Sequence, residues 1–181
     1  PEWALGMSFR FLAEIEEGDD QRWASIDEDV EDDDDGGLHS AGEAKVDLFV
    51  RKLGFPAAQS ALSTLFQQYS SSARWQERFA AAMAARASVE FLVDHDGAAD
   101  SAAAMLVALS KDGHMRVRYA AVFALGQMFH DLDKSFPARW QERLVPELLR
   151  GVADPVDRVS AKATSSLEAL IGELDEAALG P

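Results

Sequence analysis

Residues 114–132 read HMRVRYAAVFALGQMFHDL and contain the pattern that decides the fold. Small and medium apolar side chains recur there at i, i+3, i+4, i+7, i+8 and i+11: Val117, Ala120, Ala121, Ala124, Leu125 and Met128. This spacing places all six on one face of an α-helix, which predicts an amphipathic helix with a buried stripe.

Two related segments flank this helix at nearly equal distances. They are residues 75–81, WQERFAA, and residues 155–161, PVDRVSA. Anchored on Arg78, Arg118 and Ser160, the three segments stand 40 and 42 residues apart. A helical unit that repeats every 40 to 47 residues is typical of a HEAT-type α-solenoid. Solenoids of this kind usually present binding surfaces, so the period favours a binding protein over an enzyme.

The remaining periodicity extends this unit along the whole chain. Apolar stripes and turn residues predict helices at about 3–17, 43–53, 56–69, 74–93, 98–110, 114–132, 135–152 and 155–176. We therefore expect an all-α, right-handed solenoid of about four antiparallel helix pairs in a single unit spanning residues 1–181. The expected repeats are 3–54, 56–93, 97–132 and 135–176, and Pro146 predicts a kink, or a break at Val145.

Composition narrows the class of protein further. The 181 residues include no cysteine, which excludes disulfides and thiolate metal sites. We find neither a charged-then-apolar leader nor an apolar run of about 18 residues, so no membrane contact is expected. The chain begins at Pro1 without a methionine and shows no polar capping repeat. We therefore expect it to be a piece of a longer solenoid.

The negative charge is concentrated in one segment. Residues 14–35 hold 13 of the 32 acidic residues and one basic residue, Arg22, while the whole chain carries a net charge of -15. Periodicity is lost over residues 18–41, so we expect an extended, mobile acidic loop there. A field of this sign attracts basic partners and repels nucleic acid.

The acidic run within that loop is the first candidate for partner binding. Eight of its nine positions are acidic: Asp27, Glu28, Asp29, Glu31, Asp32, Asp33, Asp34 and Asp35. These carboxylates can mimic nucleic acid for a segment rich in lysine and arginine, with an affinity that falls as salt rises. The alternative is a solvated insertion without a role, but a long loop inside a compact array is unusual unless it is functional.

Catalytic patterns are missing from the sequence. The four histidines, at positions 39, 95, 114 and 130, are scattered and form no HExxH pair. There is no phosphate-binding loop or GxGxxG motif, and the charge is wrong for a DNA glycosylase. We therefore expect no enzyme activity, no cofactor and no metal.

The order of elements resembles the importin-β (karyopherin-β) family of nuclear transport receptors. The resemblance rests on four landmarks: FLAEIEE at 11–17 followed by Trp23 and the acidic run, SAGEAKVD at 40–47 with Leu53-Gly54, the helix with Trp75 and Arg78, and RVRYAA at 116–121 with ALGQM at 124–128. The last landmark resembles the branch that imports ribosomal proteins and histones.

This resemblance implies a function and a set of partners. It implies a segment of a nuclear import receptor that binds basic cargo, is regulated by the GTPase Ran, and shuttles between cytoplasm and nucleus through the nuclear pore. It also implies pockets between the first helices of successive pairs for Phe-Gly nucleoporins. Four side chains could contribute to such pockets: Leu65, Phe66, Met105 and Leu109.

Other candidates lie on the second helices of the pairs, which line the concave face in this family. Arg116 could face an acidic ligand, and Tyr119, Phe123 and His130 could touch cargo or could be core against the next repeat. For Arg118 we expect a structural pairing with Asp112, and for Arg78 a similar role. Trp75 and Trp140 are expected to be packing residues at helix ends.

A second functional class stays open at this point. A HEAT-repeat scaffold, such as a regulatory subunit of a phosphatase, would share the fold without Ran or nucleoporin contacts. The acidic loop and the helix beginning at Arg116 favour the transport receptor.

Overall fold

The structure is a computed structural model. It describes residues 2–15, 18, 20–25, 37–133 and 135–179, the last five of these by backbone alone. The acidic run predicted to bind partners, Asp27 to Asp35, therefore lies outside the described residues.

The described residues form helices and no strand. In chain order they are α1 (Glu2–Leu12), α2 (Asp20–Ser25), α3 (Leu38–Leu53), α4 (Phe55–Ser70), α5 (Trp75–Arg86), the 3-10 helix η1 (Val89–Leu92), α6 (Asp96–Leu109), α7 (Met115–Asp131), α8 (Ser135–Val152) and α9 (Asp157–Leu179). The predicted all-α solenoid is confirmed.

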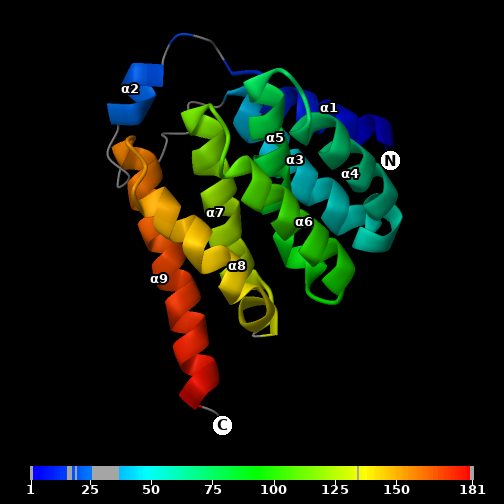
Figure 1. Cartoon of the computed structure of the whole chain (residues 1–181). Coiled ribbons are helices and arrows are strands. Elements are labelled where there is room, and N and C mark those ends of the chain that lie inside the picture. Colours follow the sequence, from blue (N-terminus) through cyan, green and yellow to red (C-terminus); the bar gives the residue numbers. More distant parts are fainter. Residues whose placement is uncertain (1, 16–17, 19, 26–36, 134, 180–181) are drawn as a thin grey trace.

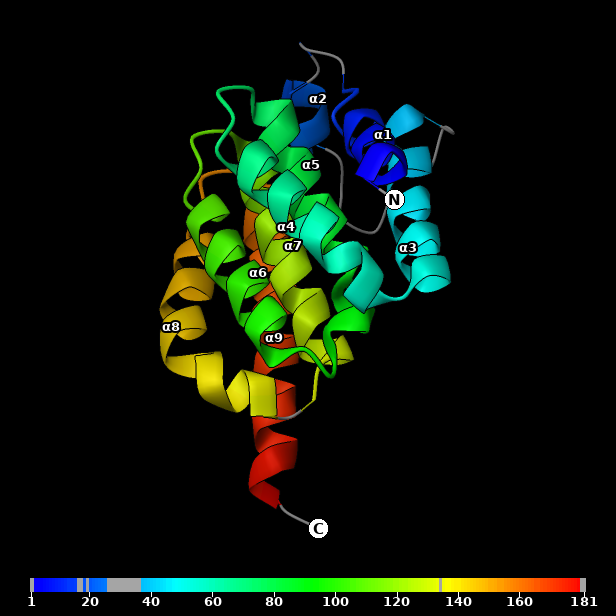
Figure 2. The ribbon, with the colours of Figure 1, turned by 90° about the vertical axis from the view of Figure 1, so that its right-hand side faces the viewer.

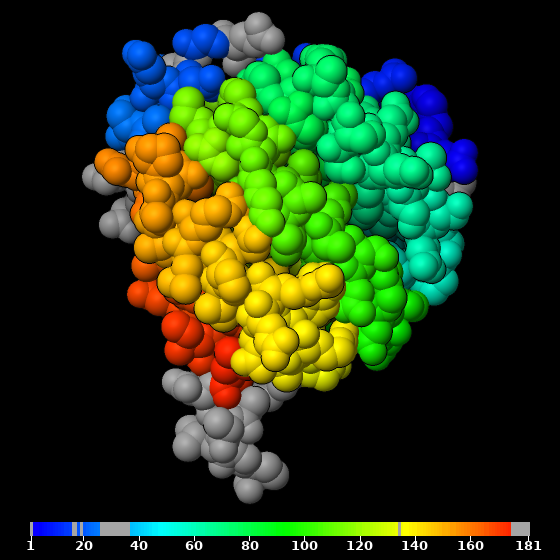
Figure 3. All heavy atoms as spheres, viewed as in Figure 1, coloured from blue at the N-terminus to red at the C-terminus, as the bar shows by residue number. Residues whose placement is uncertain are grey.

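The helices form two layers that run the length of the molecule. Helices α4, α6 and α8 lie side by side on the face shown in Figures 1 and 3, which we call the A face. Helix α7 packs against α5 on one side and α9 on the other, and α1 packs against α3. Figure 2 shows α6 and α8 on one side of α7 and α9, with α3 on the other. We call the face carried by α3, α5, α7 and α9 the B face.

Small residues set the close spacing of the second layer. Residues 80–85 of α5, mostly alanine, are all buried between their neighbours. Gly126 of α7 lies against α9 so closely that a Cβ there would come 2.5 Å from Ser166 Oγ. Because these positions lack bulk, neighbouring B-layer helices approach each other closely, and one core runs through all the repeats.

A ladder of arginine–aspartate pairs joins successive repeats. Arg78 donates to both carboxylate oxygens of Asp112, at 2.6 and 2.9 Å, and Arg118 donates in the same way to Asp154, at 2.6 and 3.0 Å. The expectation that Arg118 pairs with Asp112 is wrong for the side chain. Arg118 reaches only the Asp112 backbone oxygen, at 3.1 Å, because its guanidinium extends towards the following repeat.

The first repeat differs from its prediction. The first helix ends at Leu12 instead of residue 17, and the third begins at Leu38 instead of 43. Part of the segment expected to be an extended loop, residues 20–25, is the helix α2. The single buried side chain of that helix, Trp23, is only 8% exposed, so a tertiary contact gives this polar stretch its structure.

Among the later helices, α5 departs from its expected bounds, whereas α8 has its expected bounds and follows the kinked alternative. Helix α5 ends at Arg86, where the Ser88 hydroxyl donates to the backbone oxygens of Ala84 and Ala85, and η1 follows. Helix α8 continues through Pro146, so no break occurs at Val145. The ribbon of α8 nevertheless changes direction along its length in Figure 2, as expected when proline removes a backbone hydrogen bond.

Candidate functional site

Three predicted B-face residues come together at the start of α7. The Tyr119 ring lies 5.9 Å from that of Phe123, and the Arg86 guanidinium lies 4.1 Å from the Phe123 centroid. Arg116 lies one turn before Tyr119 and is only 8% exposed. The fourth candidate, His130, is exposed at the far end of α7. Since 14 helical residues span roughly 21 Å, His130 belongs to a different part of this face.

Helix α2 covers the first of these residues. Trp23 meets Tyr119 edge to face with ring centroids 5.2 Å apart, and the guanidinium of Arg158 lies 4.5 Å from the Trp23 ring. Asp20 of the same helix lies beside Arg116 and His114. Figure 1 shows α2 next to the beginning of α9, away from α1 and α3. We call this place, formed by Trp75, His114, Arg116, Tyr119 and Arg158, the arginine cleft.

A second place on the B face gathers carboxylates. A hollow of about 450 Å³ is bordered by α3, α5, η1 and α7, and its charged or polar lining residues are Glu43, Asp47, Arg86, Glu90, Gln127 and Asp131. We call it the acidic hollow. Four carboxylates face two nearby guanidiniums, since Arg86 pairs with Glu43 and Arg51 pairs with Asp47 at 2.8 Å and with Glu90 at 2.7 Å. The hollow therefore keeps an excess of negative charge.

Electrostatics within the hollow favour an added cation. The hydrogen bond from Arg51 lowers the pKa of Asp47 below its usual value. Burial and the neighbouring Asp47 carboxylate instead raise the pKa of Glu90, in spite of Arg51. The guanidinium of Arg51 thus does not neutralise both Asp47 and Glu90. A second cation, supplied by a ligand, would be stabilised in the acidic hollow.

Sequence reasoning missed the acidic hollow, although a signal was present. Asp47, Glu90 and Asp131 stand 43 and 41 residues apart, which is the repeat period. Asp131 is the last residue of α7, where the helix dipole adds negative potential, whereas Glu90 lies in η1 after the end of α5 and Asp47 lies within α3. A search for acidic residues at the period of the solenoid, in addition to runs of acids, would have found them.

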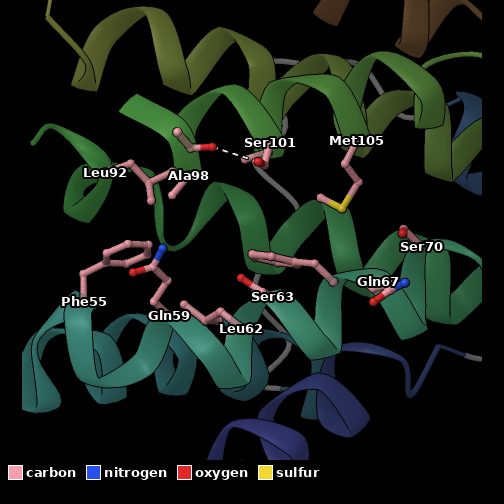
Figure 4. Close-up of a pocket in the computed structure, with 13 residues that line it drawn as sticks. Phe55, Gln59, Leu62, Ser63, Gln67, Ser70, Leu92, Ala98, Ser101 and Met105 are labelled. Carbon is pink, nitrogen blue, oxygen red and sulfur yellow. Dashed lines mark hydrogen bonds between the residues drawn. The ribbon is translucent and has the colours of Figure 1, made fainter. Parts of the chain in front are cut away.

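The A face carries an apolar groove between α4 and α6. It has a volume of about 490 Å³, and Figure 4 shows side chains of the two helices facing each other across it. Of the side chains predicted for such a groove, Phe66 and Met105 line it. Leu65 instead borders a separate hollow beside α1, and Leu109 is buried in the core.

The two tryptophans expected at helix ends make packing contacts. Trp75 stacks on His114 with ring centroids 3.8 Å apart, and Trp140 is buried and donates its Nε1 hydrogen to Asp100 at 2.6 Å. Across the part of the chain that the structure describes, no group of three or more histidine, aspartate or glutamate side chains is arranged so that it could hold a metal ion. Nor is any described helix long and apolar enough to cross a membrane.

Known proteins resemble the chain in sequence and in structure. Residues 104–132 match the HEAT repeat family. Importin subunit beta-3 of Saccharomyces cerevisiae is 28% identical over 158 residues, which are 86% of this chain and 14% of that protein. Crystal structures of Kap121p bound to RanGTP and to Nup53p match at TM-scores of 0.86 and 0.85, with 25% identity, over 93% of this chain and 17% of theirs. The chain thus spans less than a fifth of the length of these relatives.

Proposed function

We propose that this chain, which belongs to the importin-β family of nuclear transport receptors, contributes to a receptor surface that binds basic cargo through the acidic hollow. The observation that carries this proposal is the convergence of Asp47, Glu90 and Asp131, from three successive repeats, on one hollow of the B face. A solenoid that repeats a carboxylate at its own period suits an extended segment with several lysines or arginines.

The related structures give this proposal its biological setting. Kap121p has been crystallised with Pho4p, with Ste12p and with RanGTP. By this kinship we further propose Ran-regulated import of basic cargo by the whole receptor, in the branch that carries ribosomal proteins and histones, with shuttling between cytoplasm and nucleus through the nuclear pore. The acidic run, Asp27 to Asp35, is proposed as a second electrostatic contact for the same cargo.

The test is a fluorescence titration with a labelled lysine- and arginine-rich import peptide at low and at physiological salt. The variant Asp47→Asn/Glu90→Gln/Asp131→Asn should bind about tenfold more weakly, because three exposed charge pairs at roughly 0.5 kcal/mol each amount to about that factor. The matched control, Glu2→Asn/Asp94→Asn/Glu142→Gln, removes three exposed carboxylates outside the hollow and should bind within about twofold of the original chain.

If both triple variants bound the peptide equally weakly, the hollow would act only through its contribution to net charge. That result would overturn the proposed site. A chain that lacks residues 27–35 separates the acidic run from the hollow. Peptide binding lost with the run and retained in the triple variant would assign the cargo contact to the run alone.

The A-face groove supports a second contact, with Phe-Gly nucleoporins. Its apolar lining residues are Phe55, Leu62 and Phe66 on one side and Ala102 and Met105 on the other, and its volume of about 490 Å³ is enough to receive a phenyl ring. Ser63 lines the groove from an exposed helical position, whereas its exposed neighbour Thr64 does not line it. Ser63→Trp should therefore abolish binding of a Phe-Gly peptide, and Thr64→Trp should leave it intact. Equal binding by the two variants would exclude the groove.

A further inference from the structure

Helix α2 packs on the solenoid without contributing to its continuous hydrophobic core. It has six residues, too few to be stable as an isolated helix. Its only buried side chain, Trp23, is not among the residues that form the continuous hydrophobic core. Helices α4 to α9 are packed through their own core and through the arginine–aspartate ladder, neither of which includes a residue of α2.

We propose that the arginine cleft is a binding site for a partner segment that carries a carboxylate and, one helical turn later, a large aromatic side chain. In this chain α2 occupies the cleft in cis, with Asp20 and Trp23 spaced three residues apart in that order. A partner segment of the same chemistry would displace it. This inference rests on the contacts of α2 alone and is independent of the proposed cargo site.

The aromatic part of the cleft is built for an indole or phenol ring. Trp23 lies edge-on to Tyr119, at 89° between ring planes, and both Arg158 and Arg116 approach its ring, at 4.5 and 5.4 Å. Arg158 also donates through Nη1 to the backbone oxygen of Trp23 at 3.1 Å. A guanidinium over an aromatic face is attracted by the ring quadrupole, so the cleft selects for aromatic side chains over aliphatic ones.

The polar part of the cleft has more donor capacity than α2 uses. Asp20 Oδ1 lies 3.0 Å from Arg116 Nε, and Oδ2 lies 3.2 Å from His114 Nε2. Arg116 Nε is fully buried and still makes no directed hydrogen bond, and the buried His114 Nδ1 is also without one. A buried donor left unsatisfied costs free energy, so a better-placed acceptor from a partner would bind more strongly than Asp20 does.

The experiment uses a fluorescein-labelled peptide with the sequence of residues 18–25, GDDQRWAS, titrated to millimolar concentration against four chains. The original chain should bind weakly, because α2 competes at the high effective concentration of a tethered segment. Asp20→Ala/Trp23→Ala, which empties the cleft, should bind at least about tenfold more tightly. Adding Arg158→Ala should abolish that gain, whereas Arg143→Ala, an exposed arginine on α8, should not.

Arg116→Gln repeats the test should Arg158→Ala fail to fold, as judged by circular dichroism. A second readout is hydrogen exchange of the original chain. Excess peptide should speed exchange in residues 20–25 and leave α7 protected. Equal peptide affinity for the original chain and the emptied cleft, binding that survives loss of Arg158 or Arg116, or binding to none of the chains would each overturn the proposal.

Discussion

Arg116 and Arg118 stand two residues apart on α7 and serve different parts of the molecule. Arg118 belongs to the ladder and holds Asp154, whose side chain is 8% exposed, with two hydrogen bonds. Arg116 belongs to the arginine cleft and holds Asp20, whose side chain is 37% exposed, without a directed hydrogen bond from its Nε. Arginine thus stabilises the solenoid at position 118, whereas at position 116 it contacts α2, the helix that a partner segment would displace.

The helix geometry explains the division. Residues two positions apart on an α-helix are rotated by roughly 200° about the helix axis. The side chains of Arg116 and Arg118 therefore point to nearly opposite sides of α7. The second residues of α5, α7 and α9 are Gln76, Arg116 and Arg158, and all three are buried polar side chains. The fourth residues are Arg78, Arg118 and Ser160, two of which build the ladder. Position within the first turn therefore decides the role of each arginine.

The largest expected effect on stability comes from removing one arginine–aspartate pair of the ladder. Arg118→Ala should lower the free energy of unfolding by about 3 kcal/mol, because it leaves the nearly buried Asp154 carboxylate unpaired. For a chain of this size that corresponds to a fall in Tm of roughly 6–12 °C in a thermal scan. The control is Arg74→Ala, which breaks an exposed pair with Glu77 and should change stability by less than about 0.5 kcal/mol. Similar losses in the two variants would remove the distinction between ladder and surface pairs.

Double-mutant cycles would measure the same contrast directly. We expect a coupling of about 2 kcal/mol between Arg118 and Asp154, and below about 1 kcal/mol between Arg116 and Asp20. The reason is that Asp20 is partly hydrated and lies on a short helix that can separate from the solenoid. Urea denaturation of the single and double alanine variants gives both values. A stronger coupling in the cleft than in the ladder would contradict the comparison.

Removal of Trp23 should have a smaller and more local effect. Trp23→Ala is expected to cost about 1 kcal/mol, since the freed α2 regains conformational entropy and no core cavity forms. By comparison, Phe129→Ala should cost roughly 3–5 kcal/mol, because Phe129 is fully buried in the core. Hydrogen exchange should show protection lost in residues 20–25 and kept in α9. A loss of protection throughout α7 and α9 would make α2 part of the core.

Acid should loosen the cleft before it loosens the ladder. Burial lowers the pKa of His114 below its ordinary 6.5, although Asp20 opposes this shift. The unfolded chain then takes up the proton first, so stability from this group is present above pH 6.5 and is lost as pH falls below it.

In the ladder, burial raises the pKa of Asp112, but hydrogen bonds from Arg78 and from the His114 backbone outweigh it and hold the pKa below the ordinary 3.8. This contribution is therefore lost only as pH falls below 3.8. Urea titrations between pH 7.5 and 3 would separate the two steps. His114→Gln should remove the first step and Asp112→Asn the second, and an unchanged profile in His114→Gln would rule out the assignment of the cleft step.

Local pattern predicted most of the helices, because each apolar stripe repeats with the helical period. Helix α7, predicted at 114–132 and observed at Met115–Asp131, and α8, predicted at 135–152 and observed at Ser135–Val152, show how far this reasoning reaches. It was least accurate in the first repeat, where α2 has no stripe of its own and exists through the contact of Trp23 with Tyr119 and Arg158. The sequence pattern also could not predict the ion-pair partner of Arg118. Acidic residues lie within reach on two sides of Arg118, and only the packing of the repeats selects Asp154.

The sequence by itself determined the class of the fold, the repeat period, the concentration of negative charge and the resemblance to nuclear transport receptors. These properties depend on composition and on spacings within one helix or one period, which a linear chain displays directly. Only the tertiary structure decided that Asp47, Glu90 and Asp131 share one hollow and that Asp20 and Trp23 fill an arginine cleft whose residues are all more than 50 positions away in the chain. Such contacts depend on how stacked repeats bring distant side chains together, and that geometry follows from the packing of whole helices.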